Sequence, residues 1–174
     1  MLLYILIGLA VVIVGILIVA SLKPNTVRYE RSAVINASPE KILPHIADFH
    51  NWKAWSPWEK KDPGMKRDYS GVPKGVGAKY GWNGNNAVGE GTMEIVETST
   101  NMVKIDMRFV KPFKNDCVVT FHFTPTGNAT TVRWAMDGPN LFVGKVMSVF
   151  MDMDKLIGKD FEAGLAGLKA VVEK

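Results

Sequence analysis

Few titratable side chains in this sequence have a spacing that suits chemistry. Glu90 and Glu94 are four residues apart, which places two carboxylates on one side of a strand. Such a pair can act in general acid–base catalysis. They share that side with Thr92, whereas Met93 and Ile95 point the other way. We therefore expect both carboxylates on the solvent side of a sheet, as part of a solvated surface.

Histidine and cysteine offer no stronger site. His45 and His50 fall in one helical region, but no cysteine or further histidine accompanies them, so a metal site is not expected. His122 points outward by alternation, and Cys117 has no base near it in the sequence, which favours a small structural thiol over a nucleophile. The glycines of residues 71–77 precede no helix and form no phosphate loop. The sequence predicts no catalytic residue, metal or cofactor.

Length and composition bound the class of protein. The 174 residues are enough for one domain together with a membrane segment. Hydrophobic residues make up 47% and charged residues 22%, values typical of a folded chain, so a wholly disordered protein is excluded. The net charge is +4, but Lys and Arg occur singly or in pairs, so we expect no nucleic-acid partner and a solvated surface near an anionic membrane.

The amino-terminal segment carries no charge from residue 2 to residue 22. At about 1.5 Å per residue, a helix of this length spans roughly 30 Å of hydrocarbon. A cleaved signal peptide is the alternative, but no basic residue precedes the apolar run, and the run exceeds the roughly 7 to 15 residues of a signal core. We expect a retained single-pass anchor over residues 1–23 and a linker over residues 24–28.

The residues that follow this segment predict its orientation. Lys23, Arg28 and Arg31 come directly after it, and cytoplasmic ends of membrane spans are enriched in such residues. We expect an inner-membrane protein whose domain, residues 29–174, lies on the cytoplasmic side. The oligomeric state is not indicated.

The sequence of residues 29–174 predicts an α+β fold. Ser38 is a suitable N-cap and Pro39 a suitable first residue for a helix limited or kinked by Pro44. After it, we expect a second short helix over residues 49–58, ending before Pro57. Period-two alternation between turns then predicts an antiparallel meander. Expected strands lie near residues 27–36, 65–70, 78–83, 88–98, 102–110, 116–125 and 129–137, and expected late helices near residues 143–151 and 153–173.

The last helix has apolar residues at near-helical spacing and should lie across the concave side of the sheet. Gly158, Gly164 and Gly167 each weaken a helix by about 1 kcal/mol relative to Ala. Two interpretations stay open: a helix tightly packed against its neighbours, or a loose lid over a cavity.

Several local motifs resemble the SRPBCC superfamily, also called START-like or polyketide cyclase/dehydrase-like. They are residues 37–41, 47–52 leading into 55–58, Asp62-Pro63, and 158–162 with Gly164-Leu165. The similarity covers roughly residues 26–173, particularly with members that carry an amino-terminal span. It implies a helix-grip fold, in which a curved seven-stranded antiparallel sheet wraps around the long terminal helix. Members bind lipids, sterols, polyketides and other hydrophobic molecules, and only some are enzymes.

One face of the expected sheet is almost purely apolar and rich in aromatic and methionine side chains. We expect a membrane-anchored binding domain for a hydrophobic small molecule or lipid. Ligand-binding residues are then Trp52, Trp55, Tyr80, Trp82, Met93, Ile105, Met107, Phe109, Phe121, Phe123, Trp134, Met136, Phe161 and Leu165.

Other interpretations of the same face stay open. For any one of these aromatic residues, plain core packing is the favoured interpretation, and the binding hypothesis depends on the residues as a group. A cyclase-like or hydrolase-like enzyme could use Tyr80 or Asp106 for proton transfer, although alternation turns Asp106 outward. An adaptor with a filled core that binds a protein partner at the membrane is the third possibility.

Overall fold

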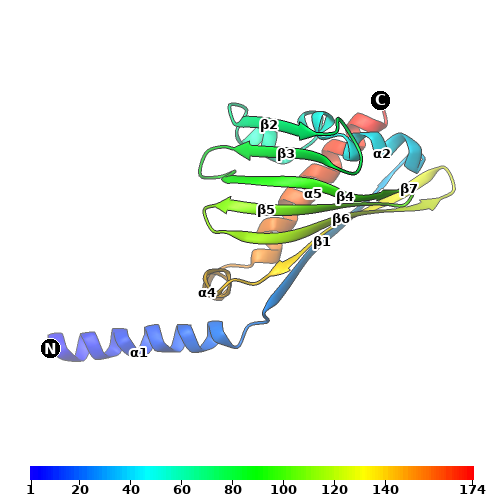
Figure 1. The fold of residues 1–174 in the computed structure, drawn as a ribbon. Helices are drawn as coiled ribbons and strands as arrows, with labels where there is room; N and C mark the ends of the chain where they lie inside the picture. The colour runs from blue at the N-terminus through cyan, green and yellow to red at the C-terminus, as the bar shows by residue number, and fades with distance from the viewer.

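The computed structural model describes residues 1–174 and shows an α+β fold in which a curved antiparallel sheet holds a long helix on its concave side (Figure 1). The strand order is β1-β7-β6-β5-β4-β3-β2. The strands are β1 (Thr26–Ile35), β2 (Lys66–Gly71), β3 (Ala78–Asn83), β4 (Glu90–Ser99), β5 (Met102–Lys111), β6 (Asn115–Thr126) and β7 (Ala129–Pro139). The helices are α1 (Leu2–Ser21), α2 (Pro39–Ala47), the 3-10 helix η1 (Phe49–Ala54), α3 (Pro57–Lys61), α4 (Phe142–Phe150) and α5 (Met153–Val172).

The helical region before β2 differs from the expected single helix over residues 49–58. The Asp48 side chain accepts a hydrogen bond from the His50 backbone N–H and starts a 3-10 helix that ends at Ala54. Pro57 holds Ser56 in an extended conformation and then serves as the first residue of a separate helix, α3. The break turns the chain, so that α3 contacts α5.

The sheet confirms the predicted meander, and every strand bound agrees with its expected position within two residues. Strand β1 begins at Thr26, which lies opposite Pro139. The domain therefore includes residues that were expected to be linker. Alternation places the apolar residues on the concave face, and direct neighbours such as Phe121 and Trp134 pair across β6 and β7.

Helix α5 is tightly packed against its neighbours, which decides between the two interpretations of its glycines. A Cβ added at Gly167 would lie 2.6 Å from the backbone oxygen of Trp55, and one at Gly164 would lie 2.6 Å from the Trp134 ring. The glycines therefore allow α5 to approach η1 and the sheet closely. The principal contact of α5 is with β1.

Helix α1 extends away from the sheet as a separate element (Figure 1). It has 20 residues with a mean hydropathy of 3.2, which is long and apolar enough to cross a membrane. Its one buried residue is Ala20, and α1 contacts α4.

Candidate functional site

A cavity of about 200 Å³ lies between the concave face of the sheet and the helices that cover it. Of its 17 lining residues, 14 are hydrophobic, which makes it an apolar cavity with few polar groups. Most of the lining residues come from η1, α3, the strands β3 to β7 and the first half of α5, and the others lie in the segments that connect these elements. They are Trp52, Ser56, Trp58, Glu59, Met65, Tyr80, Trp82, Val88, Met93, Met107, Phe109, Val119, Trp134, Met136, Ile157, Asp160 and Phe161.

The cavity occupies one end of the concave face. Met107 and Phe109 are in the second half of β5, and Met136 is in the second half of β7, which lies at the same end of the antiparallel sheet. The helix wall at this end is the first half of α5, with Ile157 and Phe161. The other end of the concave face is filled with side chains.

Nine of the predicted ligand-binding residues line this cavity. They are Trp52, Tyr80, Trp82, Met93, Met107, Phe109, Trp134, Met136 and Phe161. Five others belong to the filled end, where they pack against one another and against the second half of α5 instead of facing the cavity. They are Trp55, Ile105, Phe121, Phe123 and Leu165, none of them more than 3% exposed.

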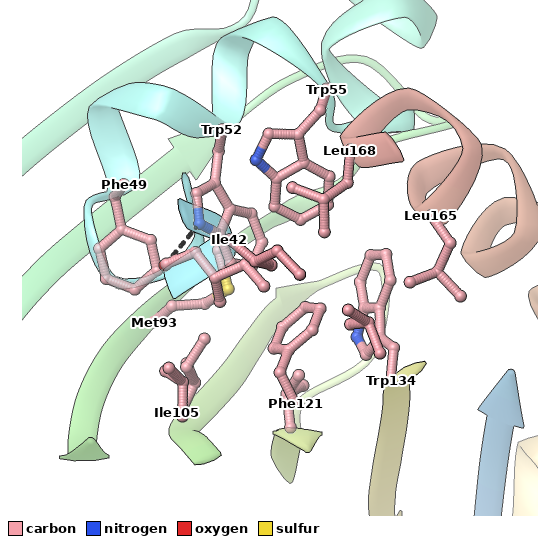
Figure 2. Packing of buried hydrophobic residues seen from close by; sticks show 14 of the residues in the cluster. Ile42, Phe49, Trp52, Trp55, Met93, Ile105, Phe121, Trp134, Leu165 and Leu168 are labelled. Atoms are coloured by element: carbon pink, nitrogen blue, oxygen red, sulfur yellow. Dashed lines mark hydrogen bonds between the residues drawn. The ribbon is translucent and has the colours of Figure 1, made fainter. Parts of the chain in front are cut away.

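The filled end is closed by Trp52 of η1 and by Trp55, the residue that directly follows this helix (Figure 2). Both tryptophans point toward Phe121 and Trp134 on the sheet, with edge-to-face contacts between ring centroids at 5.7 to 6.5 Å. Both indoles also donate hydrogen bonds to carbonyl oxygens of α2, each at 2.9 Å. This anchoring fixes η1 over the sheet and leaves no room for a ligand at that end.

Aromatic rings form much of the cavity wall. Trp134 and Phe161 stack with centroids 4.4 Å apart, and Trp58 meets Trp134 edge to face at 5.7 Å. On the opposite side, Tyr80 and Trp82 stack at 6.1 Å. The Trp82 indole donates a hydrogen bond to the Val88 carbonyl at 3.3 Å, which holds the loop between β3 and β4 against the cavity.

Sequence reasoning did not assign the cavity's three polar residues, Ser56, Glu59 and Asp160. Glu59 is buried and accepts hydrogen bonds from Arg67 Nε, which lies 3.0 Å from each carboxylate oxygen. Asp160 pairs with Lys61, with Nζ 2.6 Å from Oδ2. Each carboxylate is therefore matched by a cation, so the cavity's polar side carries no unpaired charge.

For Ser56 and Glu59 the sequence signal was weak because their orientation depends on where α3 begins. Once a helix begins at Pro57, residues 56–60 have a defined direction, and Glu59 turns inward while Lys60 turns outward. Met65 and Val88 lie just outside β2 and β4. The expected strands over residues 65–70 and 88–98 began with these two residues, but neither was assigned to the cavity. The remaining unassigned lining residues are Trp58, Val119 and Ile157.

Tyr80 is the titratable residue of the predicted set that lines the cavity. Burial, helped by the nearby Glu59 carboxylate, raises the pKa of its phenol well above the ordinary value. The phenol is therefore protonated at neutral pH, when it can donate a hydrogen bond. Asp106, in contrast, is exposed on the outer face of β5 and takes no part in the cavity.

The other residues considered for chemistry lie elsewhere. Glu90 and Glu94 form ion pairs with Lys111 and Lys79, at 2.6 and 3.2 Å. No three His, Cys, Asp or Glu side chains gather in an arrangement that could hold a metal ion. Cys117 is buried, and burial raises the pKa of its thiol.

A curved sheet that grips a long helix beside an apolar cavity defines a helix-grip protein. The sequence matches the family described as polyketide cyclase/dehydrase and lipid transport, an SRPBCC-type family, over residues 26–173. The chain belongs to this family, as the sequence motifs predicted. No curated protein sequence matches the chain.

Solved structures share the fold at low sequence identity. A protein from Chromobacterium violaceum is 18% identical, with 87% of this chain and 99% of that chain covered and a TM-score of 0.60. The Aha1 dimer from Colwellia psychrerythraea is 20% identical over 84% of this chain and 96% of its own, with a TM-score of 0.59. A protein from Thermus thermophilus is 18% identical over 84% and 97%, with a TM-score of 0.61.

Proposed function

We propose that this protein binds a hydrophobic small molecule or a lipid in the cavity between the sheet and α5, and that α1 anchors it in a membrane. The observation that carries the proposal is the cavity itself, in which hydrophobic side chains supply 14 of the 17 lining residues. The family description, which includes lipid transport, supports the same class of ligand.

The size of the cavity limits what it holds. At about 200 Å³ it is smaller than the roughly 300 to 1,000 Å³ of typical ligand sites. It therefore suits a small ring compound or one end of a longer apolar chain. Met93, Met107 and Met136 line it, and flexible methionine side chains can rearrange to admit a somewhat larger group.

Apolar burial would supply most of the binding free energy, at roughly 25 cal/mol for each Å² of apolar surface removed from water. The protonated phenol of Tyr80 would add a hydrogen bond to an acceptor on the ligand. Because Glu59 and Asp160 are already paired with cations, the site favours an uncharged ligand group over a free ammonium.

The proposal that α1 is a membrane anchor is based on its length and apolar composition. Lys23, Arg28 and Arg31 follow it, and this charge bias favours a domain on the cytoplasmic side of the inner membrane. An apolar ligand partitions into that membrane, so a tether would keep the binding domain beside its ligand source.

Native mass spectrometry of the full chain, purified in mild detergent from its own cells and followed by solvent extraction, tests the binding proposal. We expect a co-purifying apolar molecule in stoichiometric amount. Met107→Glu places a charge in the cavity and should abolish retention, whereas Val110→Glu, on the outer face of the same strand, should retain the ligand. An empty wild-type protein that also takes up no hydrophobic probe would refute the proposal.

A further inference from the structure

Large apolar side chains outside α1 are exposed around α4. Phe142 and Phe150, at the two ends of α4, are 53% and 66% exposed, and Met151 follows directly. Phe113, in the turn between β5 and β6, is 50% exposed. Exposed aromatic side chains gathered at one end of a domain indicate an interaction surface.

The turn and α4 belong to the same end of the domain. The Asn115 side chain, at the start of β6, donates a hydrogen bond to the carbonyl oxygen of Pro139 at 3.2 Å, next to the beginning of α4. Figure 1 shows α4 and the β5–β6 turn at the end of the sheet from which α1 extends. The exposed apolar side chains and the amino-terminal helix therefore share one end of the molecule.

The segment between α1 and β1 is hydrogen-bonded to Asn140, which lies just before α4, and to α4 itself. The Asn140 side chain donates to the Pro24 carbonyl at 3.0 Å, and its backbone N–H donates to the Asn25 carbonyl at 2.8 Å. The Lys145 ammonium, on α4 itself, donates to the Asn25 side-chain oxygen at 2.6 Å. These bonds hold α4 beside the carboxyl-terminal end of α1, where Ala20 is fully buried.

A bilayer crossed by α1 would have its headgroup region at the last turns of this helix, the level at which α4 is held. Phe113 lies between Lys111 and Lys114, with Pro112 beside it. Aromatic rings next to basic residues are typical of segments that lie in the headgroup region of anionic membranes. Both the apolar side chains and the neighbouring charges thus fit a lipid surface.

We propose that Phe113, Phe142, Phe150 and Met151 form an interfacial docking surface that rests in the same bilayer as α1. The inference depends on the proposed anchor. It goes beyond that anchor because α1 alone, acting as a flexible tether, would leave the domain free to rotate relative to the bilayer. Docking would also direct the cavity toward the lipid, since Phe109 and Met136 line it at this same end. An apolar ligand could then pass between bilayer and cavity with little exposure to water.

Depth-dependent quenching in the full chain tests this surface. In a Cys117→Ala background, single cysteines replace Phe113, Phe150, Val12 or Asn128 and carry an environment-sensitive fluorophore. The chain is reconstituted into vesicles of phosphatidylcholine and phosphatidylglycerol with brominated acyl chains. Val12, in α1, reports the anchor, and Asn128, in the exposed β6–β7 turn at the other end of the sheet, is the matched control.

We expect labels at residues 113 and 150 to be quenched at least about fivefold more than the label at residue 128, because interfacial side chains reach roughly 5 to 10 Å into the headgroup and acyl boundary. Quenching at residue 12 alone overturns the docking surface and leaves the anchor standing. No quenching at residue 12 overturns both.

A second copy of the chain or a protein partner is the competing occupant of this surface. It would give blue-shifted emission at residues 113 and 150 without quenching by the brominated lipid, and that outcome also overturns the proposal. Circular dichroism checks that each variant is folded, and Met151→Cys replaces Phe150→Cys if the latter does not fold.

Discussion

The indole of Trp134 and the ring of Phe161 stack face to face, with centroids 4.4 Å apart and planes inclined by 5°. This contact joins β7 to α5 and forms part of the cavity wall. Both side chains are at most 2% exposed. The same pair of rings therefore serves the stability of the domain and the shape of its cavity.

Phe161→Ala should lower the free energy of unfolding by about 3 to 5 kcal/mol, because it removes a buried ring and enlarges the neighbouring space. Urea denaturation of the full chain in mild detergent, followed by tryptophan fluorescence, measures the loss. Leu156→Ala, on an exposed position of the same helix, should change it by no more than about 0.5 kcal/mol. Equal effects of the two substitutions would mean that the ring is not part of the packed wall.

Gly167→Ala should destabilise the domain although alanine is the better helix former. The new Cβ would lie 2.6 Å from the Trp55 carbonyl oxygen, a backbone atom that cannot move without shifting η1. We expect a net loss of up to roughly 2 kcal/mol, since overpacking typically costs 1 to 3 kcal/mol and the gain in helix propensity offsets only about 1 kcal/mol of it. The measurement is the same denaturation experiment.

The control for this substitution is Ala166→Gly, at the exposed neighbouring position, which reports helix propensity without a close contact. It should cost about 1 kcal/mol. A Gly167→Ala variant more stable than the wild type would show that α5 is a loose cover.

Glu59→Gln should destabilise the domain because it leaves the mostly buried Arg67 guanidinium without its carboxylate. We expect a loss of roughly 2 kcal/mol, below the 3 to 5 kcal/mol of a fully buried pair because Arg67 keeps some contact with water. Glu94→Gln, which breaks the exposed pair with Lys79, should cost less than about 0.5 kcal/mol. The idea fails if both substitutions have the same small effect in urea denaturation.

Tyr80 should make the domain less stable in alkaline solution. Burial raises the pKa of its phenol in the folded state, so above pH of about 10 the unfolded chain loses this proton while the folded chain keeps it. The contribution of Tyr80 to stability is fully present below the unfolded pKa and decreases as the pH rises toward the folded pKa.

Denaturation curves between about pH 8 and pH 11 measure this effect, with a limiting slope of roughly 1.4 kcal/mol per pH unit for one proton. Tyr80→Phe removes the ionisable group and should reduce the alkaline loss of stability by that amount. Parallel profiles for wild type and variant would contradict the assigned pKa shift.

The face of the sheet on which each strand side chain lies was predictable from the sequence. Alternation with period two placed Tyr80, Trp82, Met107 and Trp134 on the concave face, because a strand's geometry depends only on its own backbone. The turn residues divided the meander correctly for the same reason. Local motifs identified the family, and the structure and the family match both confirm that fold.

The division of the apolar face into a filled end and a hollow end was decided only by the tertiary structure. Phe121 and Met107 have the same pattern in the sequence, yet Phe121 is covered by Trp52 and Trp55 whereas Met107 faces the cavity. A cavity is what remains after side chains from distant segments have filled space, so no periodicity within one segment can reveal it.

Close approaches between distant segments were likewise decided by tertiary structure. Gly167 is compatible with a loose or a packed helix until the Trp55 carbonyl is found against it. Glu59 turns inward because a new helix, α3, begins at Pro57, and its carboxylate then meets Arg67 at the start of β2. The sequence by itself determined which side chains could line an apolar site, since that is a local property of strands. Which of them do so was decided by packing among elements far apart in the chain.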